Sequence, residues 1–462
     1  MSSSIILPIT SILERMNKGR DTQLTFDEFK AELLAIDENG DRKYSLNMKE
    51  HGTLAIIYYD DVQTNSRRDV ELPEWEKNTR SVVWDKVLMQ PIASQYGKII
   101  YNEEAVDLLA KVDWNRVVVE PCYEGTTILV FNHDDTWYVT TRRCLDANES
   151  SWIKRKSYRE MFNETMEGKF TFDDLNPDYC YHFVLLHYLN RNIVTYSEFG
   201  NMYKEIIHTL TTRKYTCQEV HCKVSEQSRC IQRINFGNLN QLLDEVEELS
   251  KADDERKQVT TEGFIVRVYE GDVENSPFQV MKIQSELYQM LLKMKPNNSN
   301  IHQSYLELYQ RDKLREFILY FRNGKGDIIK RINMAMRQFA TEILNMYHGT
   351  RKKKNPEVYA DLMDNYRKVL YELHGVYIEN KKYSPEDGEG KSSSITVHDV
   401  YFYLKNLSPE KLRQLFLERW SMLQRNDCKS NIFMDKGNIH INIQTLLMFK
   451  NLIELPVKTE SA

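Results

Sequence analysis

The sequence RVVVEPCYEGTTI, which runs over Arg116–Ile128, decides how the rest of the chain is interpreted. Its three valines predict a β-strand, because β-branched side chains pack well on a pleated surface. The Tyr-Glu-Gly that follows predicts a sharp turn, and a second apolar run begins after it. The pattern is therefore strand, tight turn and strand, with Cys122, Glu124 and Gly125 near the tip.

Similar short runs of β-branched and aromatic residues recur between residues 52 and 285, separated by Asn, Asp and Gly. Such runs predict strands. They comprise Leu54–Tyr59, Ser81–Trp84, Ile128–Phe131, Trp137–Thr141, Tyr181–Leu186, Asn192–Tyr196 and Gly263–Tyr269. Helical patterns interrupt them near residues 157–166 and 237–250. We therefore expect an α+β domain over residues 51–285, preceded by a short helical lead over residues 1–50.

Beyond residue 285 strand signals nearly vanish, and apolar residues recur at helical spacing. They include Leu314, Phe317, Ile318, Phe321, Ile332, Met336, Phe339, Ile343 and Met346. A stripe of this kind usually faces a hydrophobic core rather than a cofactor. We expect residues 286–462 to form an all-α domain.

The net charge of −6 hides an uneven distribution. Residues 301–354 hold twelve Lys and Arg against five Asp and Glu, a surplus of +7 that leaves −13 for the rest of the chain. Such asymmetry favours an anionic partner, although a solvated helix surface has the same composition. The candidate RNA contacts are Lys325, Lys330, Arg331, Arg337, Arg351, Lys352, Lys353 and Lys354. Tyrosines interleaved with these charges would either stack on unpaired bases or face the helical core.

Composition also indicates the cellular compartment in which the protein resides. No apolar run approaches the roughly 18 residues that a membrane span requires, and seven cysteines at irregular spacing favour a reducing compartment. We expect a cytoplasmic protein without a membrane partner. Cys217, Cys222 and Cys230, with His208 and His221 nearby, could bind zinc, but their spacing fits no common zinc knuckle, so reduced thiols are the favoured interpretation.

A series of segments around the opening turn follows a recognisable order. It comprises Asn78–Asp85, Lys98–Glu104, Cys122–Thr126, Thr141–Arg143, Tyr181–Leu186, Asn190–Val194, Glu262–Val266 and Met281–Ser285. In this order the segments resemble the phage-type RNA ligases that repair broken tRNA, a family with diverged relatives in large DNA viruses. A viral relative of this kind would reside in the host cytoplasm or the virion.

The resemblance implies a ligase-type nucleotidyltransferase domain, with antiparallel sheets and flanking helices, followed by a helical domain that contacts RNA. In such a ligase a lysine amine attacks the α-phosphate of ATP, the adenylyl group passes to an RNA 5′-phosphate, and a 3′-hydroxyl displaces AMP. The implied cofactors are ATP and Mg²⁺, with Glu262 taking part in binding the metal ion. The implied nucleotide-binding residues are Arg80, Lys98, Glu124, Gly125, His182, Glu262 and Lys282.

The chain departs from the pattern of this family at three positions. The nucleophilic lysine belongs three residues before Gly125, where this chain has Cys122. His182 stands where a carboxylate is expected, and Gln284 replaces a lysine. A cysteine attacks as its thiolate, so Cys122 as nucleophile is the minor interpretation and Cys122 as a small packing residue is the major one.

Three functions remain open from the sequence. The main expectation is a degenerate RNA-ligase homologue, a pseudoenzyme that binds nucleotide or RNA ends with ligation impaired or lost. The first alternative is an active ATP-dependent RNA ligase with a non-standard nucleophile, either Cys122 or an amine from elsewhere, such as Lys98 or Lys282. The second alternative is a structural or virion-associated protein that uses the fold only for interaction.

Overall fold

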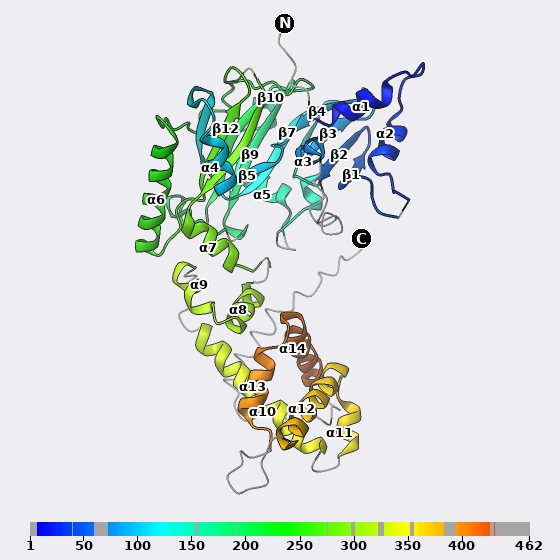
Figure 1. Cartoon of the computed structure of the whole chain (residues 1–462), viewed down its shortest axis with the longest axis vertical. Helices are drawn as coiled ribbons and strands as arrows, with labels where there is room; N and C mark the ends of the chain where they lie inside the picture. The colour runs from blue at the N-terminus through cyan, green and yellow to red at the C-terminus, as the bar shows by residue number, and fades with distance from the viewer. Residues whose placement is uncertain are drawn as a thin grey trace. The chain divides into compact units, whose positions relative to one another are not determined.

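The computed structural model describes residues 7–38, 40–59, 73–152, 156–190, 192–274, 276–296, 301–321, 328–351, 355–382, 394–425 and 429. The chain divides into two compact units, Met1–Leu292 and Lys293–Ala462, whose elements are labelled in Figure 1. None of the helices in the described segments is both long enough and apolar enough to cross a membrane.

The described residues of the first unit form three sheets, of which the first is fully antiparallel. Its order is β1-β2-β3-β4, with bounds Leu46–His51, Leu54–Tyr59, Val82–Asp85 and Gln90–Ser94. The helices α1 (Thr10–Asn17) and α2 (Phe26–Leu33) pack on it through apolar side chains. Thr25 and Glu28 form a capping box at the start of α2, and the short helix α3 (Glu74–Asn78) precedes β3.

The second sheet has the order β11-β10-β9-β7-β8. The bounds in that order are Arg229–Cys230, Lys204–Arg213, Tyr179–His187, Thr126–His133 and Thr136–Thr140. All pairs are antiparallel except β10 with β11. Helix α5 (Tyr158–Met166) covers one face, where Met161 and Phe162 are fully buried.

The third sheet has the order β5-β13-β12-β6, with bounds Ile99–Tyr101, Phe278–Gln284, Gly263–Tyr269 and Val117–Cys122. Helices α4 (Asn102–Leu109) and α6 (Leu239–Arg256) cover its apolar face (Figure 1). Helix α7 (Glu286–Met294) follows β13. The opening sequence thus forms β6, a turn and β7, and the turn connects the third sheet to the second.

The two faces of β6 differ in polarity because successive side chains of a strand point to opposite sides. Val117 and Val119 pack with the apolar core beneath α4 and α6. Glu120 and Cys122 therefore share the opposite face, and Cys122 packs there with Ile265. In the antiparallel pairing of β6 with β12, Cys122 lies opposite Gly263 and Glu120 lies opposite Ile265. This second face carries buried charged groups.

All regular elements in the described part of the second unit are helices. They are α8 (Ile301–Gln310), α9 (Leu314–Tyr320), α10 (Ile328–Arg351), α11 (Pro356–Asp361), α12 (Asp364–Lys382), α13 (Val397–Lys405) and α14 (Pro409–Gln424). The predicted apolar stripe is buried, as the hydrophobic core of this unit contains Phe317, Met336 and Ile343. The α+β class with a helical second part is therefore confirmed.

One predicted strand is wrong. Residues 192–196, which include Ile193 and Val194, form an irregular loop. Their backbone bonds to other segments instead of a neighbouring strand, since the Thr195 N–H donates to the Val259 carbonyl at 2.7 Å. The expected boundary at residues 50 and 51 falls inside β1, and the expected boundary at residues 285 and 286 falls where α7 begins.

Candidate functional site

The turn after β6 is held by close backbone packing at two glycines. Gly263 on β12 has φ +133°, and a Cβ there would lie 2.1 Å from the Ile283 carbonyl oxygen. A Cβ on Gly125 would lie 2.5 Å from Val184 Cγ1 and 2.7 Å from the Leu185 carbonyl oxygen. Glycine is needed at both positions because no side chain fits between these backbones.

Three side chains meet beside the turn, at the ends of β6, β12 and β13. They are Cys122, Glu262 and Lys282, and we call them the strand-end cluster. Lys282 Nζ lies 2.9 Å from Glu262 Oε1. Gln284 Nε2 donates to the same oxygen at 2.9 Å, and the Cys122 thiol lies beside both charged groups. Cys122 is 3% exposed and Glu262 is 4% exposed. The structure therefore brings together three of the residues predicted from the sequence.

The protonation states of the cluster follow from burial and from the neighbouring charges. Burial raises the pKa of Cys122 well above its ordinary value, and the positive charge of Lys282 offsets only part of that shift. Burial alone would lower the pKa of Lys282, but Cys122 and Glu262 outweigh it, so this pKa is raised. At neutral pH the site therefore holds a thiol and an ammonium group paired with a carboxylate.

Glu124 has a structural role at the turn. Its carboxylate accepts the Val194 N–H at 2.8 Å. Its carbonyl oxygen accepts hydrogen bonds from Asn192 Nδ2 at 2.6 Å and from the Tyr196 hydroxyl at 2.9 Å. These contacts explain why the chain from Asn192 to Tyr196 is a loop rather than a strand. Glu124 and Gly125 thus fix the turn against two neighbouring segments.

His182 lies in the middle of β9 and is buried. Burial, with smaller contributions from His208 and Arg267, lowers its pKa to about 3. The ring is neutral at physiological pH, and His182 Nε2 lies 3.3 Å from Thr212 Oγ1. A neutral imidazole therefore occupies the position at which a carboxylate was expected from the resemblance to RNA ligases.

Arg80 and Lys98 lie outside the three strands that carry the cluster. Arg80 lies in the short connection between α3 and β3, and β3 belongs to the first sheet. Lys98 Nζ is 3.8 Å from Glu104 Oε1, and 36% of the Lys98 side chain is exposed. Its backbone N–H donates to Asn78 Oδ1 at 3.1 Å. A role for either residue in nucleotide binding stays a prediction.

The predicted RNA contacts fall into two groups. Lys330, Arg331, Arg337 and Arg351 are exposed on α10. Lys325, Lys352, Lys353 and Lys354 lie outside the described residues. The interleaved tyrosines pack with the helical core, where Tyr347 is buried and Tyr305 and Tyr309 are partly buried. The charged side chains are thus the candidates for RNA contact, and the tyrosines belong to the core.

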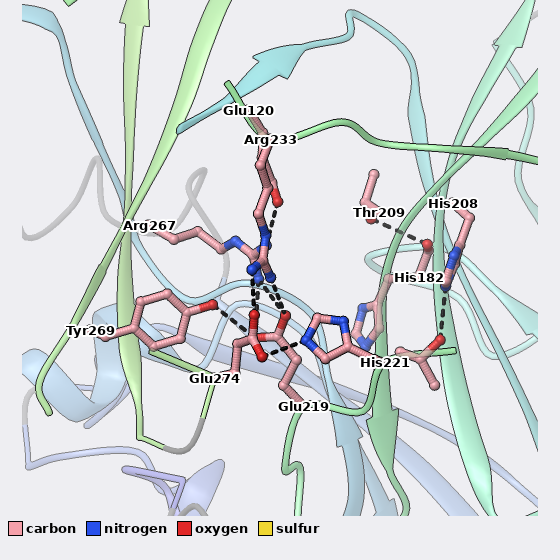
Figure 2. A network of polar contacts seen from close by, with 11 residues as sticks. Glu120, His182, His208, Thr209, Glu219, His221, Arg233, Arg267, Tyr269 and Glu274 are labelled. Atoms are coloured by element: carbon pink, nitrogen blue, oxygen red, sulfur yellow. Dashed lines mark hydrogen bonds and ion pairs between the residues drawn. The ribbon is translucent and has the colours of Figure 1, made fainter. Parts of the chain in front are cut away.

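A second group of charges on the same face of the third sheet, buried at its centre and exposed at its edge, was not predicted. We call it the arginine network: Glu120, Glu219, His221, Arg233, Arg267, Tyr269 and Glu274 (Figure 2). Arg267 pairs with Glu120 and with Glu219, the latter at 3.1 Å, and its side chain is 2% exposed. The alternation of side chains along β6 and β12 indicates that Glu120 and Arg267 face inward, but only the fold shows which groups they contact.

The arginine network borders a cavity of about 350 Å³ that Cys222, Cys230 and His208 also line. Cys230 Sγ lies 3.6 Å from His208 Nδ1. Among the residues that the structure describes, no three His, Cys, Asp or Glu side chains are placed to hold a metal ion. The preference for reduced thiols over zinc at this position stays a prediction.

Comparison with known proteins gives distant similarities, and no protein-family model matches the chain. An immediate-early protein ICP-46 homolog of Invertebrate iridescent virus 6 is 22% identical over 365 residues, covering 74% of this chain and 77% of that protein. An RNA ligase of Rhodothermus phage RM378 is 25% identical over 218 residues, covering 43% of this chain and 48% of that protein. Among solved structures, a putative ATP-dependent DNA ligase from Aquifex aeolicus matches 73% of this chain and 78% of its own, with 11% identity and a TM-score of 0.37.

Proposed function

We propose that this chain is an RNA-ligase-like nucleotidyltransferase homologue that binds a nucleotide or a phosphorylated RNA end, with ligation impaired. The observation that carries the proposal is the strand-end cluster. An ammonium and a carboxylate lie 2.9 Å apart beside the residue at which the resembling family places its nucleophile. The sequence similarity to a phage RNA ligase supports the same assignment.

The cluster has the groups that phosphate binding requires. Lys282 is a fixed positive charge in a buried site, where its attraction for phosphate oxygens is stronger than in water. Glu262 would hold a divalent ion, because Mg²⁺ in proteins is commonly bound by one or two carboxylates together with substrate phosphates. Such an ion would neutralise phosphate charge when bound. Lys282 would then exchange part of its contact with Glu262 for a phosphate oxygen.

Covalent transfer lacks a competent nucleophile at the cluster. The thiol of Cys122 is protonated because burial raises its pKa, and a thiol is a far weaker nucleophile than a thiolate. The amine of Lys282 is protonated as well, and an ammonium has no free electron pair. Gln284 adds no positive charge, and losing one electrostatic contact commonly lowers the rate about 10²- to 10³-fold. These properties disfavour an active ligase that uses Cys122.

The helical unit would supply contacts to the RNA backbone. Lys330, Arg331, Arg337 and Arg351 are exposed along α10 and can pair with phosphates. Binding of this kind releases counterions and weakens as salt concentration rises. RNA affinity should therefore fall steeply between low and physiological salt, without strong dependence on base sequence.

The test combines binding and covalent labelling. Isothermal titration with ATP and Mg²⁺ should detect binding to the wild-type chain, and Lys282→Met should weaken it at least about tenfold, which corresponds to one lost charged contact. Lys111→Met, at an exposed lysine of the same unit, is the matched control and should bind like wild type.

Incubation with α-labelled ATP, followed by denaturing electrophoresis, should leave the protein unlabelled. A label that survives denaturation and disappears in Cys122→Ala would instead establish an active enzyme with an unusual nucleophile. Failure to bind ATP, pyrophosphate or RNA would favour the structural, virion-associated role.

A further inference from the structure

One aromatic side chain fills the space between the second and third sheets beside the strand-end cluster. Tyr96 lies on the short connection between β4 and β5. On one side its ring packs with Cys122, Ile265 and Val280. On the other side it lies nearly parallel to the His182 ring, at 10° and with centroids 6.5 Å apart. The ring thus bridges the two sheets at the cluster.

The surroundings of Tyr96 have the properties of a pocket for a planar heterocycle. Apolar side chains with a few placed polar groups are typical of ligand sites, and a flat imidazole such as His182 is a stacking partner for a base. Burial raises the pKa of Tyr96 to about 12, and the charges of Arg267 and Glu120 in the arginine network also act on its phenol. A charged pair at the rim of a pocket suits the polar edge of a nucleobase.

The hydroxyl of Tyr96 has one polar neighbour besides those charged groups. Its oxygen is buried and contacts the Thr209 side chain. One neutral polar contact contributes little net stability. The position of Tyr96 is therefore set mainly by the packing of its ring.

The backbone on either side of Tyr96 is firmly held, so that the side chain is the part able to move. The Gln95 N–H donates to the Ser81 carbonyl at 2.9 Å, and Gln95 Oε1 accepts a hydrogen bond from Thr127 at 3.1 Å. A Cβ on Gly97 would lie 2.6 Å from Asn78 Oδ1, so this residue is locked against α3. Rotation of one side chain is a far smaller change than movement of the connection.

We propose that Tyr96 is an internal plug that occupies the nucleobase position and limits nucleotide affinity until its side chain swings out. This inference rests on the proposed function, because it places the phosphates at Lys282 and the base between Ile265 and His182. The plug would close only the base position and leave the phosphate position at Lys282 unchanged. A closed population reduces the observed affinity by the fraction of molecules that are open.

The test compares three ligands on matched variants. Tyr96→Ala removes the plug, and it should bind ATP with Mg²⁺ about tenfold more tightly than wild type if about a tenth of molecules are open. Tyr96→Phe keeps the ring and should bind like wild type. Inorganic pyrophosphate carries no base, so its affinity should be equal in all three proteins. AMP should follow ATP in preferring the Ala variant.

The outcomes separate the plug from the proposed function. Equal ATP affinity of wild type and Tyr96→Ala, or a parallel gain for pyrophosphate, would overturn the plug and leave nucleotide binding intact. If no variant binds ATP or pyrophosphate, both proposals fail. Should Tyr96→Ala not fold, as judged by circular dichroism, Tyr96→Leu decides the matter, since it must bind ATP more tightly than Tyr96→Phe.

Discussion

Two groups of buried charges share one face of the third sheet, and they are built differently. In the arginine network Arg267 contacts two carboxylates, and Arg233 contacts Glu219 and Glu274 in turn. The strand-end cluster has one cation and one carboxylate with a thiol beside them. The network pairs its charges with one another, although Glu120 Oε2 and Arg267 Nε have no hydrogen-bond partner among the described residues. The cluster pairs a single cation with a single carboxylate. We therefore expect the network to serve stability, whereas the proposed function assigns binding to the cluster.

The largest expected effect is the loss of Arg267. Replacing it with Met leaves Glu120 and Glu219 buried with less compensation, and removing one partner of a buried ion pair commonly costs about 3–5 kcal/mol. Urea denaturation should show this loss for Arg267→Met. Arg233, whose side chain is 37% exposed, provides the control, and Arg233→Met should cost less than about 1 kcal/mol. Equal losses of stability in the two variants would show that Arg267 at the centre of the network and Arg233 at its edge contribute alike.

The next effect concerns the backbone that supports the cluster. Gly263→Ala forces a Cβ to 2.1 Å from the Ile283 carbonyl at φ +133°, so the free energy of unfolding should fall by about 2–3 kcal/mol and ATP affinity with it. Gly271→Ala is the control, because its Cβ would meet Ser276 at an ordinary 3.5 Å. A stable Gly263→Ala variant with unchanged ATP affinity would show that the close packing of β6, β12 and β13 does not determine ATP binding.

A pH effect of smaller size should come from the buried histidines between the sheets. Burial lowers the pKa of His182 to about 3 and of His208 to about 4. The unfolded chain binds protons below about pH 6.5 while the folded chain does not, so stability falls as pH drops from 6.5 toward 4. His182→Gln should reduce the loss between pH 7 and 5 by about 1–2 kcal/mol. His221→Gln, at a side chain that is 70% exposed, should leave the loss unchanged.

The smallest effect is expected for the thiol of the cluster. If Cys122 serves only as a small buried side chain, Cys122→Ala should change the free energy of unfolding by about 1 kcal/mol and leave ATP affinity as in wild type. Cys144→Ala, at another buried cysteine of the first unit, is the matched comparison. A drop in ATP affinity of more than about tenfold for Cys122→Ala alone would give the thiol a direct part in binding.

Much of the fold could be predicted from local pattern. The predicted boundaries of β2 and β12 are those of the structure, because both strands are short β-branched runs with clear ends. The helices near residues 157–166 and 237–250 are present as α5 and α6. The stretch from Asn192 to Tyr196 has the composition of a strand, but it forms a loop whose hydrogen bonds go to Glu124 rather than to a neighbouring strand.

The candidate site was predicted only in part. The resemblance to RNA ligases singled out Glu262 and Lys282, which the structure does bring to Cys122. Nothing in the sequence indicated that Tyr96 lies against Cys122, because the two residues sit on different segments that only the packed sheets bring together. The partners of Arg267 were hidden for the same reason, since Glu120 is 147 residues away along the chain.

The sequence by itself determined the strand, turn and strand around Gly125, the helical second half and the absence of lysine at position 122. These features depend on neighbours within a few residues, where side-chain shape and periodicity act directly. Only the tertiary structure showed that the pKa values of Cys122 and Lys282 are both raised above their ordinary values. Both shifts depend on burial and on groups from distant segments, which come together only once the sheets have packed.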